Sequence, residues 1–233
     1  MALALGGVVA TAGCASMGPG APPSGTLEKI KATKKIALGY RDSSVPFSYA
    51  GPTKEPMGYS VDLCMRVVQD LRSELKLADL QPRWVPVSVE TRVRALVDGT
   101  IDLECGSTTN TLSRQERVDF SLTTFITGAS LLALAGSNVG DQLGAIRIAV
   151  IPGTTTEQMV KNAIASMGAT AADAKLVAVN DHADGLAAVV DRRAEVYATD
   201  RAILMGLVTS ASNPRQFALL DRYLSYEPYA LML

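Results

Sequence analysis

A run of hydroxyl-bearing residues followed by an arginine makes segment 104–121 the part of the chain best suited to hold an anion. Gly106 permits a tight bend, and Ser107 to Thr109 bring hydroxyls to the end of an expected strand. The Ser113-x-x-Glu116 spacing of a capping box predicts a short helix with Arg114 in its first turn. Arg114 and free backbone N–H groups would suit an incoming carboxylate. A solvated arginine or a surface ion pair is the alternative interpretation.

Segment 152–157, Pro-Gly-Thr-Thr-Thr-Glu, repeats this chemistry farther along the chain. Thr154 and Glu157 satisfy the S/T-x-x-E box, which predicts a helix whose N-terminus offers N–H donors to an anion. The bare motif marks a helix start and no more. The chain lacks the GxxxxGK[ST] pattern of a phosphate-binding P-loop and also the GxGxxG, GxSxG and HExxH patterns.

The elements that must position these segments alternate between strand and helix, which predicts an α/β fold. The first series runs strand, helix, strand, helix, strand over residues 35–40, 61–75, 83–87, 89–97 and 101–105. The second follows the same order over 146–151, 155–167, 175–179, 184–192 and 195–199, with a helix over 201–209 after it. Residues 120–135, including the apolar run 129–135, would connect them. We expect two similar lobes, each a mostly parallel sheet flanked by helices.

The candidate residues all follow strands of these two series. Arg41 follows the first strand and segment 107–114 follows the third, while Thr154 to Thr156 and Asp200 follow the corresponding strands of the second lobe. Ligands of open α/β sheets bind beyond the carboxyl ends of the strands. The sequence therefore predicts that these residues face one cleft.

The composition excludes several other functions. The 22 Lys and Arg against 23 Asp and Glu give a net charge of -1, without the basic excess typical of nucleic-acid binding. A single histidine and three cysteines, with no CxxC pair, argue against a zinc cluster or a redox motif. We therefore expect no nucleic-acid partner, no metal and no cofactor.

Cys64 and Cys105 are the two cysteines in the body of the chain. We expect both to be small buried hydrophobic residues, one on a helix and one on a strand. A disulfide between them is the alternative, which export from the cytoplasm would permit.

The first fourteen residues form an apolar stretch that is too short to span a bilayer and resembles the end of an export signal. Thr11-Ala-Gly-Cys14 resembles a bacterial lipoprotein cleavage box, which would make Cys14 a lipidated N-terminus. A plain cleaved signal and a disordered leader are the alternatives. Segment 16–25 has the composition of a flexible tether. We expect a periplasmic or extracytoplasmic location.

Four segments together carry a family resemblance. They are Arg41-Asp-Ser-Ser-Val-Pro-Phe-Ser-Tyr49, Gly58-Tyr-Ser-Val-Asp62, Gly99-Thr-Ile-Asp-Leu-Glu-Cys-Gly-Ser-Thr-Thr-Asn110 and Gly153-Thr-Thr-Thr-Glu157. The chain resembles the periplasmic glutamate/aspartate-binding proteins, from the polar amino-acid-binding branch of the ABC-transporter solute receptors. The resemblance runs from about residue 27 to the C-terminus.

The resemblance implies a role for each polar residue near the strand ends. Arg114 would clamp the α-carboxylate of an amino acid, assisted by Ser107, Thr109 and Thr155, and Asp200 would hold its α-ammonium group.

Arg41, Arg92 and His182 would contact the side-chain carboxylate of an acidic ligand. Three arginines and a histidine suit a dianionic amino acid better than a neutral one. An exposed helical Arg92 and an ordinary helix-start His182 are the alternatives.

The resemblance also implies the organisation of the chain. Residues 1–25 would be the leader and tether, 26–128 the first lobe, 129–225 the second lobe, and 226–233 the start of a return crossing to the first lobe. Family members complete the first lobe with C-terminal helices beyond this point, so we expect a fragment or a shortened product.

The expected function is capture of glutamate or aspartate by a monomer and delivery to a membrane permease, without catalysis. An enzyme on the same fold, similar to a prephenate or arogenate dehydratase, is one alternative. Glu104 or His182 would then be a general acid without a defined partner. A ligand-sensing ectodomain is the other alternative.

Overall fold

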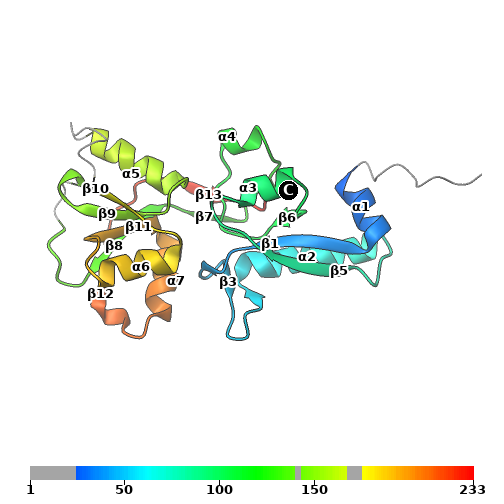
Figure 1. Ribbon diagram of the computed structural model, residues 1–233, viewed down its shortest axis with the longest axis horizontal. Coiled ribbons are helices and arrows are strands. Elements are labelled where there is room, and N and C mark those ends of the chain that lie inside the picture. Colours follow the sequence, from blue (N-terminus) through cyan, green and yellow to red (C-terminus); the bar gives the residue numbers. More distant parts are fainter. Residues whose placement is uncertain (1–24, 140–142, 167–174) are drawn as a thin grey trace, which may run out of the picture.

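The structure is a computed structural model that describes residues 25–139, 143–166 and 175–233. Its two lobes lie at opposite ends of the long axis, and two short strands run between them (Figure 1). The predicted leader and the lipidation site Cys14 lie outside the described residues. None of the helices in the described part of the chain is long and apolar enough to cross a membrane.

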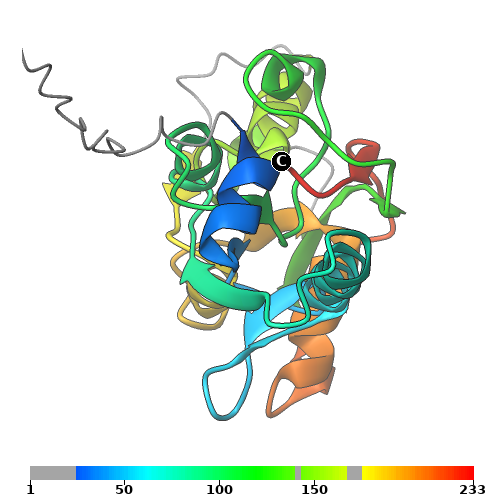
Figure 2. The same cartoon turned by 90° about the vertical axis from the view of Figure 1, so that its right-hand side faces the viewer.

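The first lobe is built on a parallel sheet of strand order β5-β1-β6. Its strands and helices are α1 (Thr26–Thr33), β1 (Lys35–Tyr40), α2 (Tyr59–Glu74), β5 (Gln81–Pro86), α3 (Arg92–Val97), β6 (Leu103–Glu104) and α4 (Leu112–Gln115). A small antiparallel sheet of β2 (Ser43–Ser44), β3 (Ser48–Ala50) and β4 (Pro56–Met57) lies beside it. Seen from the end of this lobe, α1 crosses the front and the second lobe lies behind (Figure 2).

The second lobe contains a five-stranded sheet of order β10-β9-β11-β8-β12. Its strands and helices are β8 (Ala129–Leu134), η1 (Leu143–Ala145), β9 (Arg147–Val150), α5 (Thr155–Ser166), β10 (Lys175–Ala178), α6 (His182–Val190), β11 (Val196–Asp200), α7 (Arg201–Ser210), η2 (Pro214–Gln216) and β12 (Phe217–Leu219). In this sheet β8 runs antiparallel to both of its neighbours, β11 and β12. The predicted alternation of strands and helices is therefore confirmed in both lobes.

The prediction that the apolar run 129–135 connects the lobes is wrong. This run forms β8, a buried strand between β11 and β12. A strand covered on both faces reads as a continuous apolar run, which hid its place in the sheet. The segments that pass between the lobes are β7 (Phe125–Thr127) and β13 (Glu227–Tyr229), which pair antiparallel.

A first-lobe loop also packs against the crossing strands and the second lobe. Phe47, in the loop between β2 and β3, packs edge-to-face on Phe125 of β7 and Tyr229 of β13, with ring centroids 4.9 and 5.1 Å away. A Cβ atom on Gly206 of α7 would lie 2.6 Å from the carbonyl oxygen of Val45. The absence of a side chain at position 206 therefore lets the second lobe approach the first-lobe loop closely.

The expectation that Cys64 and Cys105 are unpaired is wrong, because they form a disulfide. Cys64 lies on the buried face of α2 and Cys105 directly follows β6, so their Cα atoms are 6.1 Å apart. This separation falls in the range that a disulfide requires. The bond fixes the start of the loop that carries Ser107 against α2.

We expect the double variant Cys64→Ala/Cys105→Ala to unfold more easily by about 2–4 kcal/mol, because the disulfide closes a long loop in the unfolded chain. Urea unfolding of both proteins measures the difference. Reductant should destabilise the parent by a similar amount and leave the variant unchanged. Equal stability of parent and variant would contradict the prediction.

Candidate ligand-binding site

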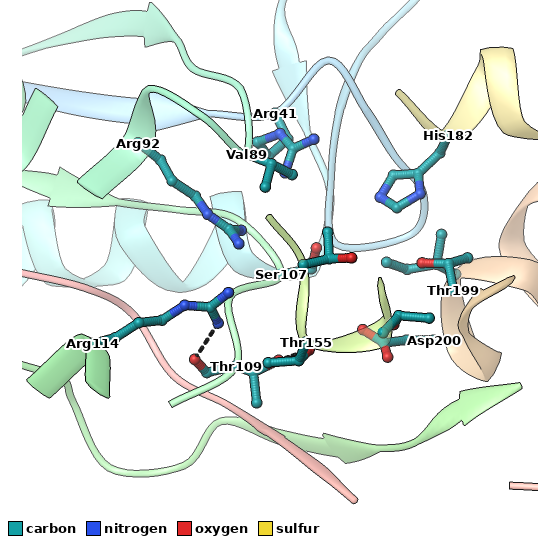
Figure 3. Close-up of a pocket in the computed structure, with 13 residues that line it drawn as sticks. Arg41, Val89, Arg92, Ser107, Thr109, Arg114, Thr155, His182, Thr199 and Asp200 are labelled. Atoms are coloured by element: carbon teal, nitrogen blue, oxygen red, sulfur yellow. Dashed lines mark hydrogen bonds between the residues drawn. The ribbon is translucent and has the colours of Figure 1, made fainter. Parts of the chain in front are cut away.

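One pocket between the lobes collects all eight residues that the sequence singled out. They are Arg41, Arg92, Ser107, Thr109, Arg114, Thr155, His182 and Asp200. Side chains from the first lobe enter from one side and His182, Thr199 and Asp200 from the other (Figure 3). The pocket lies at the carboxyl ends of β1, β6, β9 and β11, as expected for open α/β sheets.

Three arginines form the cationic side of this pocket. Arg41 follows β1, Arg92 is the first residue of α3, and Arg114 lies in α4. Arg41 and Arg92 are buried, with 2% and 4% of their surface exposed, whereas Arg114 is half-buried. The alternative of an exposed Arg92 is therefore wrong. Such burial is unusual for arginine without a paired anion, so the cluster favours an anionic ligand.

The hydrogen bonds of these arginines leave donors free. Arg92 Nη1 donates to Thr108 Oγ1 at 2.6 Å, and Arg114 Nη1 donates to the carbonyl oxygen of Thr109 at 2.7 Å. The Nε atoms of Arg41 and Arg92 are buried and have no partner among the described residues. Burial lowers the pKa of Arg92 to about 9, and the charge of Glu104 opposes this shift. Arginine side chains stay protonated in proteins, so the three guanidinium groups are cations at neutral pH.

A different cap from the predicted one holds Arg114. Thr111, rather than Ser113, is the N-cap of α4, and its side chain accepts a hydrogen bond from the backbone N–H of Arg114 at 3.3 Å. The prediction of a Ser113-x-x-Glu116 capping box is therefore wrong. Several hydroxyl residues precede α4, and the spacing alone did not distinguish between them. Arg114 still lies in the first turn, as predicted.

The second-lobe turn at 153–157 follows the prediction. Thr154 Oγ1 accepts from the backbone N–H of Glu157 at 3.1 Å, and Glu157 Oε2 accepts from the N–H of Gly153 at 2.8 Å. This cap starts α5 and brings Thr155 to the pocket. Thr155 Oγ1 lies 3.4 Å from Thr109 Oγ1 of the first lobe and 2.8 Å from Glu227 Oε2. The hydroxyl pair therefore bridges the two lobes.

Asp200 is the anionic residue opposite the arginines. It ends β11 and occupies the N-cap position of α7 without a side-chain capping hydrogen bond, with 6% of its surface exposed. Its Oδ2 accepts a hydrogen bond from the Tyr229 hydroxyl, and its buried Oδ1 has no partner within the described ranges. Burial raises the pKa of Asp200 to about 7, while the Tyr229 bond and the charges of Arg92 and Arg114 oppose that rise.

His182 is a neutral member of the site. It is the first residue of α6, and its Nδ1 lies 2.7 Å from the Tyr197 hydroxyl. Burial and the charges of Arg41 and Arg92 hold the pKa of His182 well below its usual range. A neutral imidazole can offer a hydrogen bond to a ligand without adding a charge.

Sequence reasoning missed several residues that line or support the pocket. They are Val89, Thr199, Ile203, Glu227 and Tyr229. Thr199 adjoins Asp200, which was predicted, so its position at the end of a strand was a usable signal. Tyr229 and Glu227 lie in a crossing strand, and no spacing pattern connects that strand to Asp200 or Thr155.

The pocket is narrow as well as polar. Its cavity volume is about 20 Å³, close to the room that one water molecule needs by the same measure, about 10–15 Å³. A larger guest therefore requires the lobes to separate first. In the described ranges no group of three or more His, Cys, Asp or Glu side chains is arranged to hold a metal ion.

Comparisons with known structures support this architecture. An ancestral arginine-binding protein bound to arginine has a TM-score of 0.74 at 22% identity, covering 86% of this chain and 84% of that one. The ancestral amino acid-binding protein AncCDT-1, a precursor of cyclohexadienyl dehydratase, has a TM-score of 0.75 at 22% identity, covering 90% and 86%. At this identity the likeness shows the fold alone.

Comparisons of sequence identify the family. The L-glutamate/L-aspartate-binding protein of Pseudomonas aeruginosa is 38% identical over 215 residues, which cover 90% of this chain and 70% of the relative. The glutamate/aspartate import solute-binding protein of Salmonella typhimurium is 35% identical over 228 residues, covering 96% and 74%. The family model of the bacterial extracellular solute-binding proteins, family 3, matches residues 36–217. The chain therefore belongs to the bacterial extracellular solute-binding proteins of family 3.

Proposed function

We propose that the protein binds glutamate or aspartate outside the cytoplasm and delivers it to the permease of an ABC transporter. The single observation that carries this proposal is the set of three arginines facing Asp200 across one narrow pocket. Such a charge distribution complements an amino acid with two carboxylates and one ammonium group. The names of the similar proteins from Pseudomonas and Salmonella support the same ligand class.

In this proposal each polar residue has a separate role. Arg114 clamps the α-carboxylate with the hydroxyls of Ser107, Thr109 and Thr155. The unpartnered Oδ1 of Asp200 supports a role in holding the α-ammonium group.

The other cationic residues serve the ligand's side chain. Arg41 and Arg92 pair with its carboxylate, and His182 adds a neutral hydrogen bond. Their burial supports this role, because a buried cation gains most from a paired anion.

We further propose that the protein is not an enzyme. The two candidate general acids already have local partners: Glu104 accepts from the Thr108 hydroxyl at 2.9 Å, and His182 lies 2.7 Å from the Tyr197 hydroxyl. Both arrangements support a fixed, non-reacting role. The related proteins named above are solute-binding proteins.

The remaining expectations are also part of this proposal. We assign residues 26–128 to the first lobe and 129–225 to the second, with the return crossing beginning near 226. Separate sheets on either side of the paired strands β7 and β13 support these boundaries. A monomer, anchored in the membrane by lipidation of Cys14, would present the captured ligand to the permease.

Calorimetric titration with acidic, amide and neutral amino acids tests the function on the parent and on Arg41→Ala. We expect the parent to bind glutamate or aspartate at least tenfold more tightly than glutamine or asparagine. In Arg41→Ala we expect this affinity ratio between acidic and amide ligands to fall at least tenfold. A second carboxylate gains charge-assisted hydrogen bonds of about 1.5–3 kcal/mol each from buried cations. A parent that prefers glutamine would overturn the ligand class. A variant that keeps the full acidic preference would remove Arg41 from the site.

A further inference from the structure

Glu104 is a fully buried carboxylate at the edge of the pocket. It ends β6, has 0% of its surface exposed, and accepts a hydrogen bond at Oε2 from Thr108 Oγ1 at 2.9 Å. Its Oε1 has no hydrogen-bond partner in the part of the chain that the structure describes. A buried carboxylate with an unpartnered oxygen is costly unless nearby cations stabilise its charge.

The loop after β6 is shaped around this carboxylate. A Cβ atom on Gly106 would lie 2.1 Å from Glu104 Oε1 and 3.2 Å from Cγ of Arg41. No residue with a side chain fits at position 106 without displacing the carboxylate. The glycine therefore allows Glu104 and the stem of Arg41 to pack against the same bend.

A single hydroxyl connects Glu104 to Arg92. Thr108 Oγ1 accepts from Arg92 Nη1 at 2.6 Å and donates to Glu104 Oε2 at 2.9 Å. Burial lowers the pKa of Arg41, Arg92 and Arg114, and in each case Glu104 is the strongest influence in the opposite direction. One carboxylate therefore stabilises all three cations.

The charges on the first-lobe side of the pocket fit a particular class of ligand. The three guanidinium groups and the Glu104 carboxylate together leave two net positive charges there, and two ligand carboxylates would neutralise them. Glu227, which comes from the crossing strand, is instead bonded by the hydroxyls of Ser225 and Thr155 at 2.6 and 2.8 Å. We propose that Glu104 is a specificity-determining counter-ion, which cancels one arginine charge and sets the pocket for ligands with two carboxylates. This inference rests on the proposed function.

The variant Glu104→Gln tests the inference, because it removes the charge and keeps the shape and the acceptor for Thr108. The probes are L-glutamate and O-phospho-L-serine, which are similar in length. At pH 8 the phosphate carries almost two negative charges, since its second pKa is about 6. Without the charge of Glu104, the third arginine attracts the doubly charged phosphate more strongly than it attracts a singly charged carboxylate.

We expect calorimetry to show that the ratio of the affinity for O-phospho-L-serine to the affinity for glutamate is at least tenfold higher in Glu104→Gln than in the parent. Glu104→Asp keeps the charge and should keep the parent's ratio. Glu116→Gln, the same change at the exposed residue that follows α4, should change neither affinity. An equal loss of affinity for both ligands in Glu104→Gln would show a purely structural role for Glu104 and overturn the inference. The proposed function would still stand in that case, provided that the parent prefers glutamate.

A measurement on the parent alone covers the case in which Glu104→Gln fails to fold. At pH 5 the phosphate of O-phospho-L-serine carries close to one negative charge, since its second pKa is about 6. A pocket matched to a singly charged side chain should therefore bind O-phospho-L-serine more tightly relative to glutamate at pH 5 than at pH 8. An affinity ratio that is the same at both pH values would overturn the charge-matching role. A parent that binds only monocarboxylic ligands would overturn both proposals.

Discussion

Replacing Arg114 with alanine is expected to abolish amino-acid binding and to leave the fold intact. The guanidinium is half-buried in the pocket and donates to the Thr109 carbonyl oxygen at 2.7 Å, so it is held in place before a ligand arrives. Truncating one partner of a buried, hydrogen-bonded charge pair costs about 2–5 kcal/mol or more. We therefore expect the dissociation constant for glutamate to rise at least about a hundredfold, since each 1.4 kcal/mol is a factor of ten.

Calorimetric titration at neutral pH measures this change, and thermal unfolding tests the fold. Arg114 contributes to none of the three hydrophobic clusters, so the unfolding midpoint should change little. Arg117→Ala, in the same segment but exposed, is the matched control and should bind like the parent. An Arg114→Ala protein with unchanged affinity would refute the assignment of the α-carboxylate clamp.

Replacing Asp200 with asparagine is expected to weaken ligands that carry an α-ammonium group and to spare those that lack it. Asp200 Oδ1 is buried and unpartnered, while Oδ2 is occupied by the Tyr229 hydroxyl. Asparagine keeps the shape and removes the charge. At pH 8 we expect glutamate affinity to fall at least about thirtyfold, or roughly 2 kcal/mol. The affinity for glutarate, which lacks the ammonium group, should stay level or improve.

Asp221→Asn, at an exposed position in the second lobe, controls for the substitution itself. Competition titrations with glutamate and glutarate on the three proteins give the comparison. Equal losses for both ligands in Asp200→Asn would mean that Asp200 acts through the structure of the pocket and not through the ammonium group.

The same residue predicts how binding depends on pH. Burial raises the pKa of Asp200 to about 7, so its carboxylate is mostly protonated at pH 6 and mostly ionised at pH 8. Pairing with an ammonium group requires the ionised form, so affinity for glutamate should fall as the pH is lowered through 7. A pKa of 7 leaves about one carboxylate in eleven ionised at pH 6. The affinity for glutamate should therefore be roughly tenfold lower at pH 6 than at pH 8. This dependence should disappear in Asp200→Asn, because His182 has a pKa well below this range.

The sequence predicted the parts of the fold and site that depend on local patterns. The apolar spacing of α2 and the run of β1 set the element order, and the rule that ligands bind at strand ends brought Arg41, Arg114 and Asp200 to one pocket. Arg92 and His182 came from the family resemblance, because nothing in their immediate surroundings distinguishes them from surface residues.

Features that depend on distances between remote segments were not predictable. The bond between Cys64 and Cys105 depends on how α2 packs against β6, and 41 residues separate the two cysteines. Tyr229 reaches Asp200 from a crossing strand 29 residues away. Glu104 was considered only as an acid, since its position between a glycine bend and buried arginines becomes visible only in three dimensions.

The narrowness of the pocket has a consequence for the timing of ligand exchange. An amino acid does not fit in a cavity of about 20 Å³, so we expect it to enter and leave when the lobes move apart. The dissociation rate constant then includes the opening rate of the whole molecule, and residence time depends on contacts such as the one between Gly206 and the Val45 loop. The rate at which the lobes open would therefore set how long the ligand stays bound. A membrane partner that pries the lobes apart would shorten the residence time without touching the bound molecule.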